Sequence, residues 1–430
     1  NLNIYIIRTN SFGDTIWTSS LGSPLHDVGY CIRETSDGYF VVCGTWADPT
    51  YNEINDFAGD VFVALLNPYG DTVWTWKYLG GNNILHGGAN YILEDDDGNF
   101  VLTGGMRHAG YNKKHAFLLK LRRSDQSVLW EQIFPPEDYV SYTTCVIKTP
   151  DNDGFILSGL VYPPNHNGCD VYIVKTDSVG DTIWTNMTGE WGDYEARHMD
   201  LTFDGGIIIT GNTGFDTTTR IAYIMKIDSM GNYEWHKHFP SGYPNVPTSC
   251  FGIKQTTDSG FLLTGYHPNI HTNSQDLSLI KTDQAGDTIW RRLFGNKIGS
   301  QYYDKGYALA LLSDGYAIVG FTNEGNGGKD MYFVRTNENG IITSTQDSPF
   351  QNFINISSQI ILYPNPSNDY INIAASNEGK LELINIKGET LYKKDFSGPQ
   401  RIDISLYSKG LYFMKISREN TVEVMKFIIN

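Results

Sequence analysis

The chain has 430 residues, of which 40% are hydrophobic and 19% charged, enough to form one large globular body and a small one. Its formal net charge of −16 argues against the basic surface with which nucleic-acid-binding proteins hold phosphate groups, so we expect no nucleic-acid partner. The aromatic content of 13% and the 44 glycines favour strands and turns, and we expect an all-β protein. No apolar run approaches the roughly 18 residues of a transmembrane helix, so we expect no membrane span.

The sequence repeats itself with a period of about 55 residues. The segment TNSFGDTIWT at 9–18 returns as NPYGDTVWT at 67–75, TDSVGDTIWT at 176–185 and TDQAGDTIW at 282–290, with weaker copies at 124–130 and 228–235. A second marker, an apolar segment ending in glycine, recurs at Gly44, Gly104, Gly159, Gly211, Gly265 and Gly320. Each unit reads as four short strands, here called a to d in chain order, which is the content of a β-propeller blade.

The residue types in each unit indicate where its strands lie. Strand c, as in DVYIVKT at 170–176, is apolar on both faces, as expected for a sheet packed between two neighbours. Strand a carries small residues, which suits the crowded innermost position. We expect Gly180 to supply the positive φ of a tight c–d turn, Asp177 to bond backbone two residues on, and the following Trp184 to pack between blades. These motifs differ in spacing from sialidase-type Asp boxes, and we interpret them as structural.

The number of blades follows from counting strands. Seven c strands begin near residues 3, 60, 116, 170, 221, 276 and 330, but there are only six pairs of a and b strands. Either the first blade lacks its inner half because the upstream strands are missing from this chain, or six blades close by mixing terminal strands. We favour seven blades with an incomplete first blade. The last blade has a weak d strand at 340–345, which fits a ring closed by an N-terminal d strand.

Cys31 and Cys43 flank a short turn and should face each other on neighbouring strands. They are either a disulfide or two small buried hydrophobic side chains. The five cysteines of the chain are too few and too scattered for a disulfide scaffold or a zinc site.

A second domain follows the repeats. We expect the propeller to span 1–343, a polar linker 344–359, and a small Ig-like β-sandwich 360–430, where alternating strands are separated by glycine turns.

This C-terminal segment resembles the type A sorting domain of cargo proteins of the type IX secretion system of Bacteroidota. The resemblance rests on YPNP (Tyr363, Pro364, Asn365 and Pro366), the turn at Gly388, the segment SKGLYFMKI around Gly410 and Tyr412, and Lys426 before an apolar end. It implies export across the outer membrane to the cell surface or medium, and recognition of this domain by the translocon and its shuttle proteins. It also implies removal of the domain with transfer of the cargo to a surface lipopolysaccharide. The chain starts at Asn1 without a leader, so we expect any secretory signal to lie upstream.

The face of the propeller that carries the b–c and d–a loops is the candidate binding surface, because these loops are long and divergent. Its exposed aromatic residues lie among Asn, Asp and Gly and could stack on sugar rings or dock a protein. They are Trp46, Tyr51, Tyr111, Tyr162, Trp191, Tyr194, Tyr243, Tyr266, Tyr302 and Tyr303. Alternatively, they pack the loops against one another.

The sequence contains no catalytic, metal or cofactor motif, so we expect no cofactor and no metal site. The acidic segments 95–97 and 151–153 resemble pieces of calcium loops, but we interpret them as ordinary turns. The favoured hypothesis is a non-enzymatic propeller that binds glycan or protein. The alternative is a secreted glycan hydrolase or lyase that uses loop carboxylates. The available carboxylates are Asp48, Glu53, Asp138, Glu190, Asp193, Glu195 and Asp304.

Overall fold

The chain forms two compact units, Asn1–Thr345 and Gln346–Asn430. The computed structural model describes residues 3–10, 13, 15–47, 59–78, 84–108, 113–134, 139–163, 168–188, 193–214, 220–243, 246–269, 273–295, 299, 302–323, 330–342, 361–363, 370–374, 378–397, 400–418 and 421–429. Every regular element in these ranges is a β-strand, as the composition predicts. Within them, no helix has the length and hydrophobicity that crossing a membrane requires.

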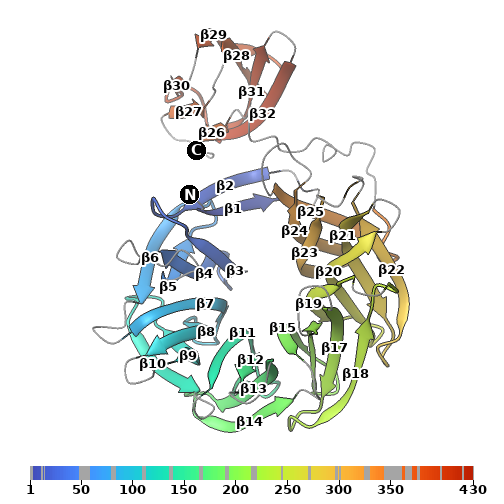
Figure 1. Cartoon of the computed structure of the whole chain (residues 1–430). Helices are drawn as coiled ribbons and strands as arrows, with labels where there is room; N and C mark the ends of the chain where they lie inside the picture. The colour runs from blue at the N-terminus through green and yellow to red at the C-terminus, as the bar shows by residue number, and fades with distance from the viewer. Residues whose placement is uncertain are drawn as a thin grey trace. The chain divides into compact units, whose positions relative to one another are not determined.

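The N-terminal unit is a ring of antiparallel sheets, the β-propeller that the repeats predict (Figure 1). Five sheets contain four strands each, and in every one the strands follow in chain order from the centre of the ring outwards. Their strands are β3 (Val28–Glu34), β4 (Phe40–Ala47), β5 (Gly59–Leu66) and β6 (Thr72–Tyr78); β7 (Ile84–Glu94), β8 (Phe100–His108), β9 (His115–Leu121) and β10 (Val128–Phe134); β11 (Val140–Lys148), β12 (Gly154–Tyr162), β13 (Asp170–Asp177) and β14 (Thr182–Thr188); β15 (Tyr194–Leu201), β16 (Ile207–Thr213), β17 (Ile221–Ile227) and β18 (Tyr233–Phe239); and β19 (Ser249–Gln255), β20 (Phe261–Asn269), β21 (Ser274–Thr282) and β22 (Thr288–Phe294).

Two further sheets are incomplete. The last blade has three strands, β23 (Asp304–Leu312), β24 (Gly315–Thr322) and β25 (Asp330–Asn337), followed by a single bridge between Thr336 and Ile342 in place of a d strand. The first blade has two strands in the described residues, β1 (Ile4–Thr9) and β2 (Thr15–Leu21), which correspond to c and d. The sheets therefore number seven, and the first lacks its inner half.

The core of the propeller lies between the blades. The c strands β5, β9, β13, β17 and β21 are buried along most of their length, because each is covered on both faces by a neighbouring sheet. The repeated Trp packs between blades as expected. Trp130 of β10, for example, lies 6.2 Å from the Phe155 ring of the next blade.

In five blades the glycine of the c–d turn lies against the Trp of the preceding blade; these glycines are Gly70, Gly180, Gly231, Gly286 and Gly340. Gly180 has φ 85°, and a Cβ at this residue would lie 2.9 Å from the Trp130 ring. Glycine is therefore required both by the backbone conformation and by the close approach of the ring. The turn is held by Asp177, whose Oδ1 accepts hydrogen bonds from the backbone N–H of Val179 (3.0 Å) and Asp181 (2.9 Å), which confirms the expected turn chemistry.

Cys31 and Cys43 are register partners on β3 and β4, but both are free thiols, like the other three cysteines. The disulfide alternative is therefore wrong for this structure. Both thiols instead point at the next blade, where Cys43 Sγ lies 3.5 Å from the Ala89 carbonyl oxygen and Cys31 Sγ lies 3.9 Å from that of Ile92. They behave as small side chains that fill the interface between two blades.

The C-terminal unit consists of two sheets. One contains β26 (Ile361–Tyr363), β27 (Tyr370–Ala374) and β30 (Gln400–Asp403), and the other contains β29 (Thr390–Ser397), β28 (Glu378–Asn385), β31 (Gly410–Arg418) and β32 (Thr421–Ile429). Side chains of both sheets, including Ile371, Leu383, Met414 and Phe427, form one buried core. This unit is a small β-sandwich, as expected. The predicted linker lies outside the described residues.

Candidate functional site

The two faces of the ring differ in how much of them the structure describes. The short-turn face carries the a–b and c–d turns, which lie within the described residues except for residues 11, 12 and 14 of the first c–d turn. The long-loop face carries the b–c and d–a connections. Residues 48–58, 79–83, 109–112, 135–138, 164–167, 189–192, 215–219, 244–245, 270–272, 296–298, 300–301 and 324–329 of that face lie outside the described residues.

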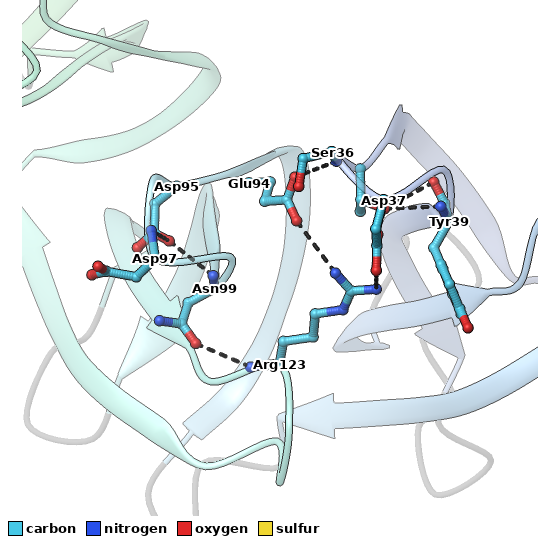
Figure 2. Close-up of polar contacts among 9 residues, drawn as sticks. Ser36, Asp37, Tyr39, Glu94, Asp95, Asp97, Asn99 and Arg123 are labelled. Carbon is cyan, nitrogen blue, oxygen red and sulfur yellow. Dashed lines mark hydrogen bonds and ion pairs between the residues drawn. The ribbon is translucent and has the colours of Figure 1, made fainter.

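The acidic segment at Asp95 is an ordinary turn. Asp95 Oδ1 accepts hydrogen bonds from the backbone N–H of Asp97 (3.0 Å) and Asn99 (2.8 Å) (Figure 2). Asp95 Oδ2 lies 2.6 Å from Lys120 Nζ. Asp96 pairs with Lys148. In the described part of the chain, no group of three His, Cys, Asp or Glu side chains could hold a metal ion. The turn interpretation accounts for these carboxylates better than a calcium loop does.

The same face contains an ion-pair network between two blades (Figure 2). Arg123 Nη2 lies 2.8 Å from Asp37 Oδ2, and Arg123 Nη1 lies 3.4 Å from Glu94 Oε1. Glu94 Oε2 in turn accepts a hydrogen bond of 2.6 Å from the backbone N–H of Ser36. Because Asp37 and Ser36 belong to the β3–β6 blade and Arg123 and Glu94 to the β7–β10 blade, this network joins adjacent blades.

The ten aromatic residues that the sequence places on the long-loop face have different environments. Tyr51, Tyr111 and Trp191 lie outside the described residues. Tyr162 and Tyr243 are exposed, with 39% and 48% of their surface accessible, whereas Trp46, Tyr302 and Tyr303 are half-buried.

Tyr194 and Tyr266 are buried, which corrects the expectation that they are exposed. Tyr194 packs edge-on against Tyr223 at 5.1 Å, and its hydroxyl lies 3.2 Å from His238 Nε2. Its burial follows from its place as the first residue of an inner strand, where it meets the two outer strands of its own blade.

Polar side chains gather at the long-loop ends of the inner strands around Glu195 of β15. Its Oε1 accepts a hydrogen bond of 3.0 Å from Arg220 Nη2, and its Oε2 accepts one from Arg197 Nη2 and one of 2.8 Å from Asn212 Nδ2. The side chains of Arg197 and Arg220 remain about one third exposed, at 31% and 33%. Two guanidinium groups therefore face one carboxylate near the centre of the ring.

Aromatic side chains of other blades interact electrostatically with this ion pair. Tyr142 of β11 and Tyr162 of β12 lie 6.4 Å apart, and Phe251 of β19 lies 4.9 Å from Tyr307 of β23. Tyr307 is 48% exposed. We call the following residues the axial cluster: Tyr142, Tyr162, Glu195, Arg197, Arg220, Phe251, Tyr266 and Tyr307.

Electrostatic interactions connect the members of the axial cluster. Burial raises the pKa of Tyr142, Tyr162, Tyr266 and Tyr307, and the positive charge of Arg197 opposes that rise at all four phenols. The pKa of Arg197 is itself raised: burial is the largest single effect and lowers it, but the interactions with Glu195, Tyr142 and Tyr162 together raise it by more. Arg197 therefore stays charged close to phenols that stay protonated.

Sequence reasoning identified only part of this cluster. It named Tyr162 and Tyr266 as aromatics and Glu195 as an available carboxylate. It missed five members, four of which lie on inner strands and not in long loops: Tyr142, Arg197, Phe251 and Tyr307, with Arg220 just before β17 as the fifth. The available signal was the presence of large or charged side chains in a strand whose other residues are small.

The residues of the sorting-domain resemblance occupy turns, strands and core of the C-terminal sandwich. Gly388, with φ 82°, lies in the β28–β29 turn, and Gly410 begins β31. Tyr412 is buried, and its hydroxyl donates a hydrogen bond of 2.7 Å to the Ser408 carbonyl oxygen. Tyr363 ends β26 and Lys426 lies on β32, whereas Pro364, Asn365 and Pro366 lie outside the described residues.

Residues 361–430 match the family described as the secretion system C-terminal sorting domain. The C-terminal unit is a type IX sorting domain. A protein with this domain is recognised by the type IX secretion machinery and is exported to the cell surface or secreted, as the resemblance implies. No curated protein matches the chain.

Solved structures with a similar fold include several propellers. PorZ, a surface component of the type IX secretion system of Porphyromonas gingivalis, is 12% identical to this chain with a TM-score of 0.41. The matched region covers 96% of this chain and 61% of PorZ. The Dos1 propeller is 10% identical with a TM-score of 0.42, and 93% of this chain covers 92% of it. The β-propeller domain of the Trilobed protease from Pyrococcus furiosus is 9% identical with a TM-score of 0.38, at coverages of 86% and 97%.

The chain thus spans about three fifths of the length of PorZ. Similarity at these identities concerns the fold, and a propeller fold hosts many unrelated functions. A functional argument must therefore rest on the residues of this chain.

Proposed function

We propose that this exported propeller binds a glycan that carries carboxylate groups, that it does so at the axial cluster, and that it does not turn the glycan over. The observation that carries the proposal is that the exposed Tyr162 and Tyr307 interact electrostatically with Arg197, which shares the Glu195 carboxylate with Arg220. The side chains of both arginines are partly exposed.

Each part of the cluster suits one part of such a ligand. A tyrosine ring offers a flat apolar surface for the C–H face of a sugar, and its hydroxyl offers a hydrogen bond. A guanidinium group binds a carboxylate through two parallel hydrogen bonds. Side chains from several blades converge here, so one chain of sugar rings lying across the centre of the ring could contact them together.

The charge balance favours an acidic ligand. The cluster contains two arginines against the single carboxylate of Glu195, although the whole chain has a net charge of −16. Lys305 adds a further cation, with its Nζ 4.6 Å from the centre of the Tyr266 ring.

The alternative, a glycan hydrolase or lyase, requires a group in this cluster that exchanges a proton. Glu195 is poorly suited because both of its carboxylate oxygens already accept hydrogen bonds, from Arg197, Arg220 and Asn212. Tyr142 is poorly suited as a base because burial raises the pKa of its phenol. These interactions favour binding over catalysis.

The test is a polysaccharide array probed with the full chain, with neutral and uronic-acid glycans side by side and product release assayed on every glycan that binds. We expect binding to acidic glycans without product release. Tyr162→Ala and Tyr307→Ala should each weaken binding about tenfold, equivalent to about 1.4 kcal/mol. Tyr69→Ala is the matched control, because Tyr69 is 58% exposed on the short-turn face.

Three results would contradict the proposal. Binding only to neutral glycans would show that the arginines do not bind carboxylate groups of the ligand. Binding that survives both tyrosine substitutions would place the ligand elsewhere on the molecule. Product release that is lost on substitution of a loop carboxylate would establish the enzyme alternative.

A further inference from the structure

The first blade exposes the inner edge of a c strand. The pairing of β1 with β2 shifts register between Arg8 and Thr9, and the c–d pairs of complete blades shift at the equivalent place, for example between Lys175 and Thr176. This shared irregularity identifies β1 as a c strand. In the five complete blades, the c strand pairs with a b strand on its inner side, whereas β1 pairs only with β2 in the described residues.

The neighbouring second blade presents an apolar side chain to this gap. Ile32 of β3 is 45% exposed, and its register partner is the residue two positions before the repeat glycine of β4. The four residues with the same pairing in the next blades are at most 1% exposed: Ile92, Val146, Met199 and Ile253. Ile92 packs in one cluster with Val41 and Val63 of the preceding blade, so Ile32 faces the missing half of the first blade.

The last blade presents apolar side chains to the same gap from the other side. Val319 of β24 is 48% exposed, whereas the residues that precede the repeat glycine in the other five blades are fully buried: Cys43, Thr103, Ser158, Thr210 and Thr264. Met331 of β25 is 55% exposed, whereas its equivalents are at most 1% exposed: Val61, Ala116, Val171, Ala222 and Leu277. Cys43 points at the following blade, so Val319 faces the first blade.

Exposed side chains and an unpaired strand edge thus converge on one gap. Isolated exposed hydrophobic residues are normal on protein surfaces, but these three are exposed where their equivalents are buried by an adjacent blade. The inner edge of β1 also presents backbone N–H and C=O groups in the geometry of a β-ladder. A segment that fills the gap must therefore supply strands as well as apolar side chains.

We propose that a two-stranded antiparallel hairpin, located before residue 1 in the intact polypeptide, completes the first blade. Chain order favours this occupant, because in all five complete blades the a and b strands directly precede the c strand. The connections from b to c are as short as residues 270–273 and as long as residues 48–58, so a preceding hairpin would be tethered close to the gap. Tethering gives it an effective concentration that a separate protein would rarely match.

The chemistry of the hairpin follows from the complete blades. Residues Val140–Tyr162, which form β11 and β12, show its size. Its outer strand would pair with β1 and would be apolar on both faces, because Ile32 lies on one side and Val319 and Met331 on the other. Its inner strand would carry small residues at the centre of the ring, as the other a strands do.

The test compares thiol labelling of Val319→Cys in two proteins: the chain that begins at Asn1 and the same chain extended by the residues encoded upstream. We expect fast labelling of the shorter chain and protection by at least about tenfold in the longer chain, because the hairpin would cover the thiol. Met230→Cys is the control, because Met230 is 71% exposed on the short-turn face and should label equally in both. The parent chain without either substitution corrects for its native cysteines.

Several outcomes would overturn the proposal. Equal labelling of Val319→Cys in both chains would show that upstream residues leave the gap open, and an open reading frame that starts at Asn1 would leave no hairpin to fill it. Protection that is already complete in dilute samples of the shorter chain would show that its own residues close the ring. Protection that appears only as the concentration rises would identify a second copy as the occupant.

Discussion

At the scale of single residues, the repeated Trp and Gly are structural and not catalytic. Trp17 is 6% exposed, packs 5.5 Å from Phe40 of the next blade, and donates a hydrogen bond of 2.9 Å from Nε1 to the Pro68 carbonyl oxygen. A Cβ at Gly70 would lie 2.7 Å from the Trp17 ring. The repeat therefore encodes the contact between consecutive blades, which explains why it recurs once per blade.

His198 should make the stability of the propeller dependent on pH. Burial, followed by the charges of Lys254 and Arg33, lowers the pKa of His198 from 6.5 to about 3. Between these values the unfolded chain binds a proton that the folded chain does not, so stability is lost as the pH falls below 6.5. The loss should reach about 1.4 kcal/mol per pH unit for this one group.

Urea unfolding of the wild type and His198→Gln at a series of pH values between 7 and 4 measures this contribution. The substitution should reduce the slope of stability against pH. Tyr91→Phe, which removes the hydroxyl 3.5 Å from His198 Nε2 but keeps the surrounding ring, should leave most of the slope in place. Equal slopes for the wild type and His198→Gln would contradict the assignment.

At the scale of elements, ion pairs on the short-turn face should hold adjacent blades together. The Arg123 side chain is 22% exposed, and Glu94, one of its partners, is 12% exposed, so the network is more shielded than an ordinary surface ion pair. Arg123 also lies 5.1 Å from the Tyr39 ring of the neighbouring blade.

Arg123→Ala should lower the free energy of unfolding by about 1 to 2 kcal/mol, between the values for exposed and buried ion pairs. Hydrogen exchange should rise mainly in the turns that contain Asp37 and Glu94. The control is Arg122→Ala, because Arg122 contacts the exposed Asp125 (3.2 Å) and Ser127 Oγ (3.2 Å), which both belong to its own turn. A stability change no larger than that of the control would show that the network contributes little.

At the scale of the whole molecule, the two units have separate tasks. The propeller unit and the C-terminal sandwich each have their own buried core. The sandwich is the type IX sorting domain. Folding of the propeller should therefore be independent of export.

Deleting residues 361–430 should keep the propeller folded but prevent it from reaching the cell surface or medium. Cell fractionation with an antibody against the propeller measures the location, and circular dichroism of the purified truncated chain measures folding. A truncated protein that is still exported in normal amounts would contradict a sorting role. An unfolded propeller would show instead that the two units depend on each other.

The sequence by itself determined the strand order, the number of c strands and the turn residues, because each depends on local pattern, and its resemblance to a known family indicated the sorting domain. Alternation and glycine positions act within a few residues, and the repeat shows the same local pattern several times. Only the tertiary structure decided the axial cluster, because Tyr142, Arg197 and Tyr307 are far apart in the chain, and Arg197 interacts electrostatically with both tyrosines when the inner strands of separate blades converge. It also decided that Tyr194 is buried and that the thiols of Cys31 and Cys43 are free, since burial and bond geometry depend on packing against partners that no local pattern specifies.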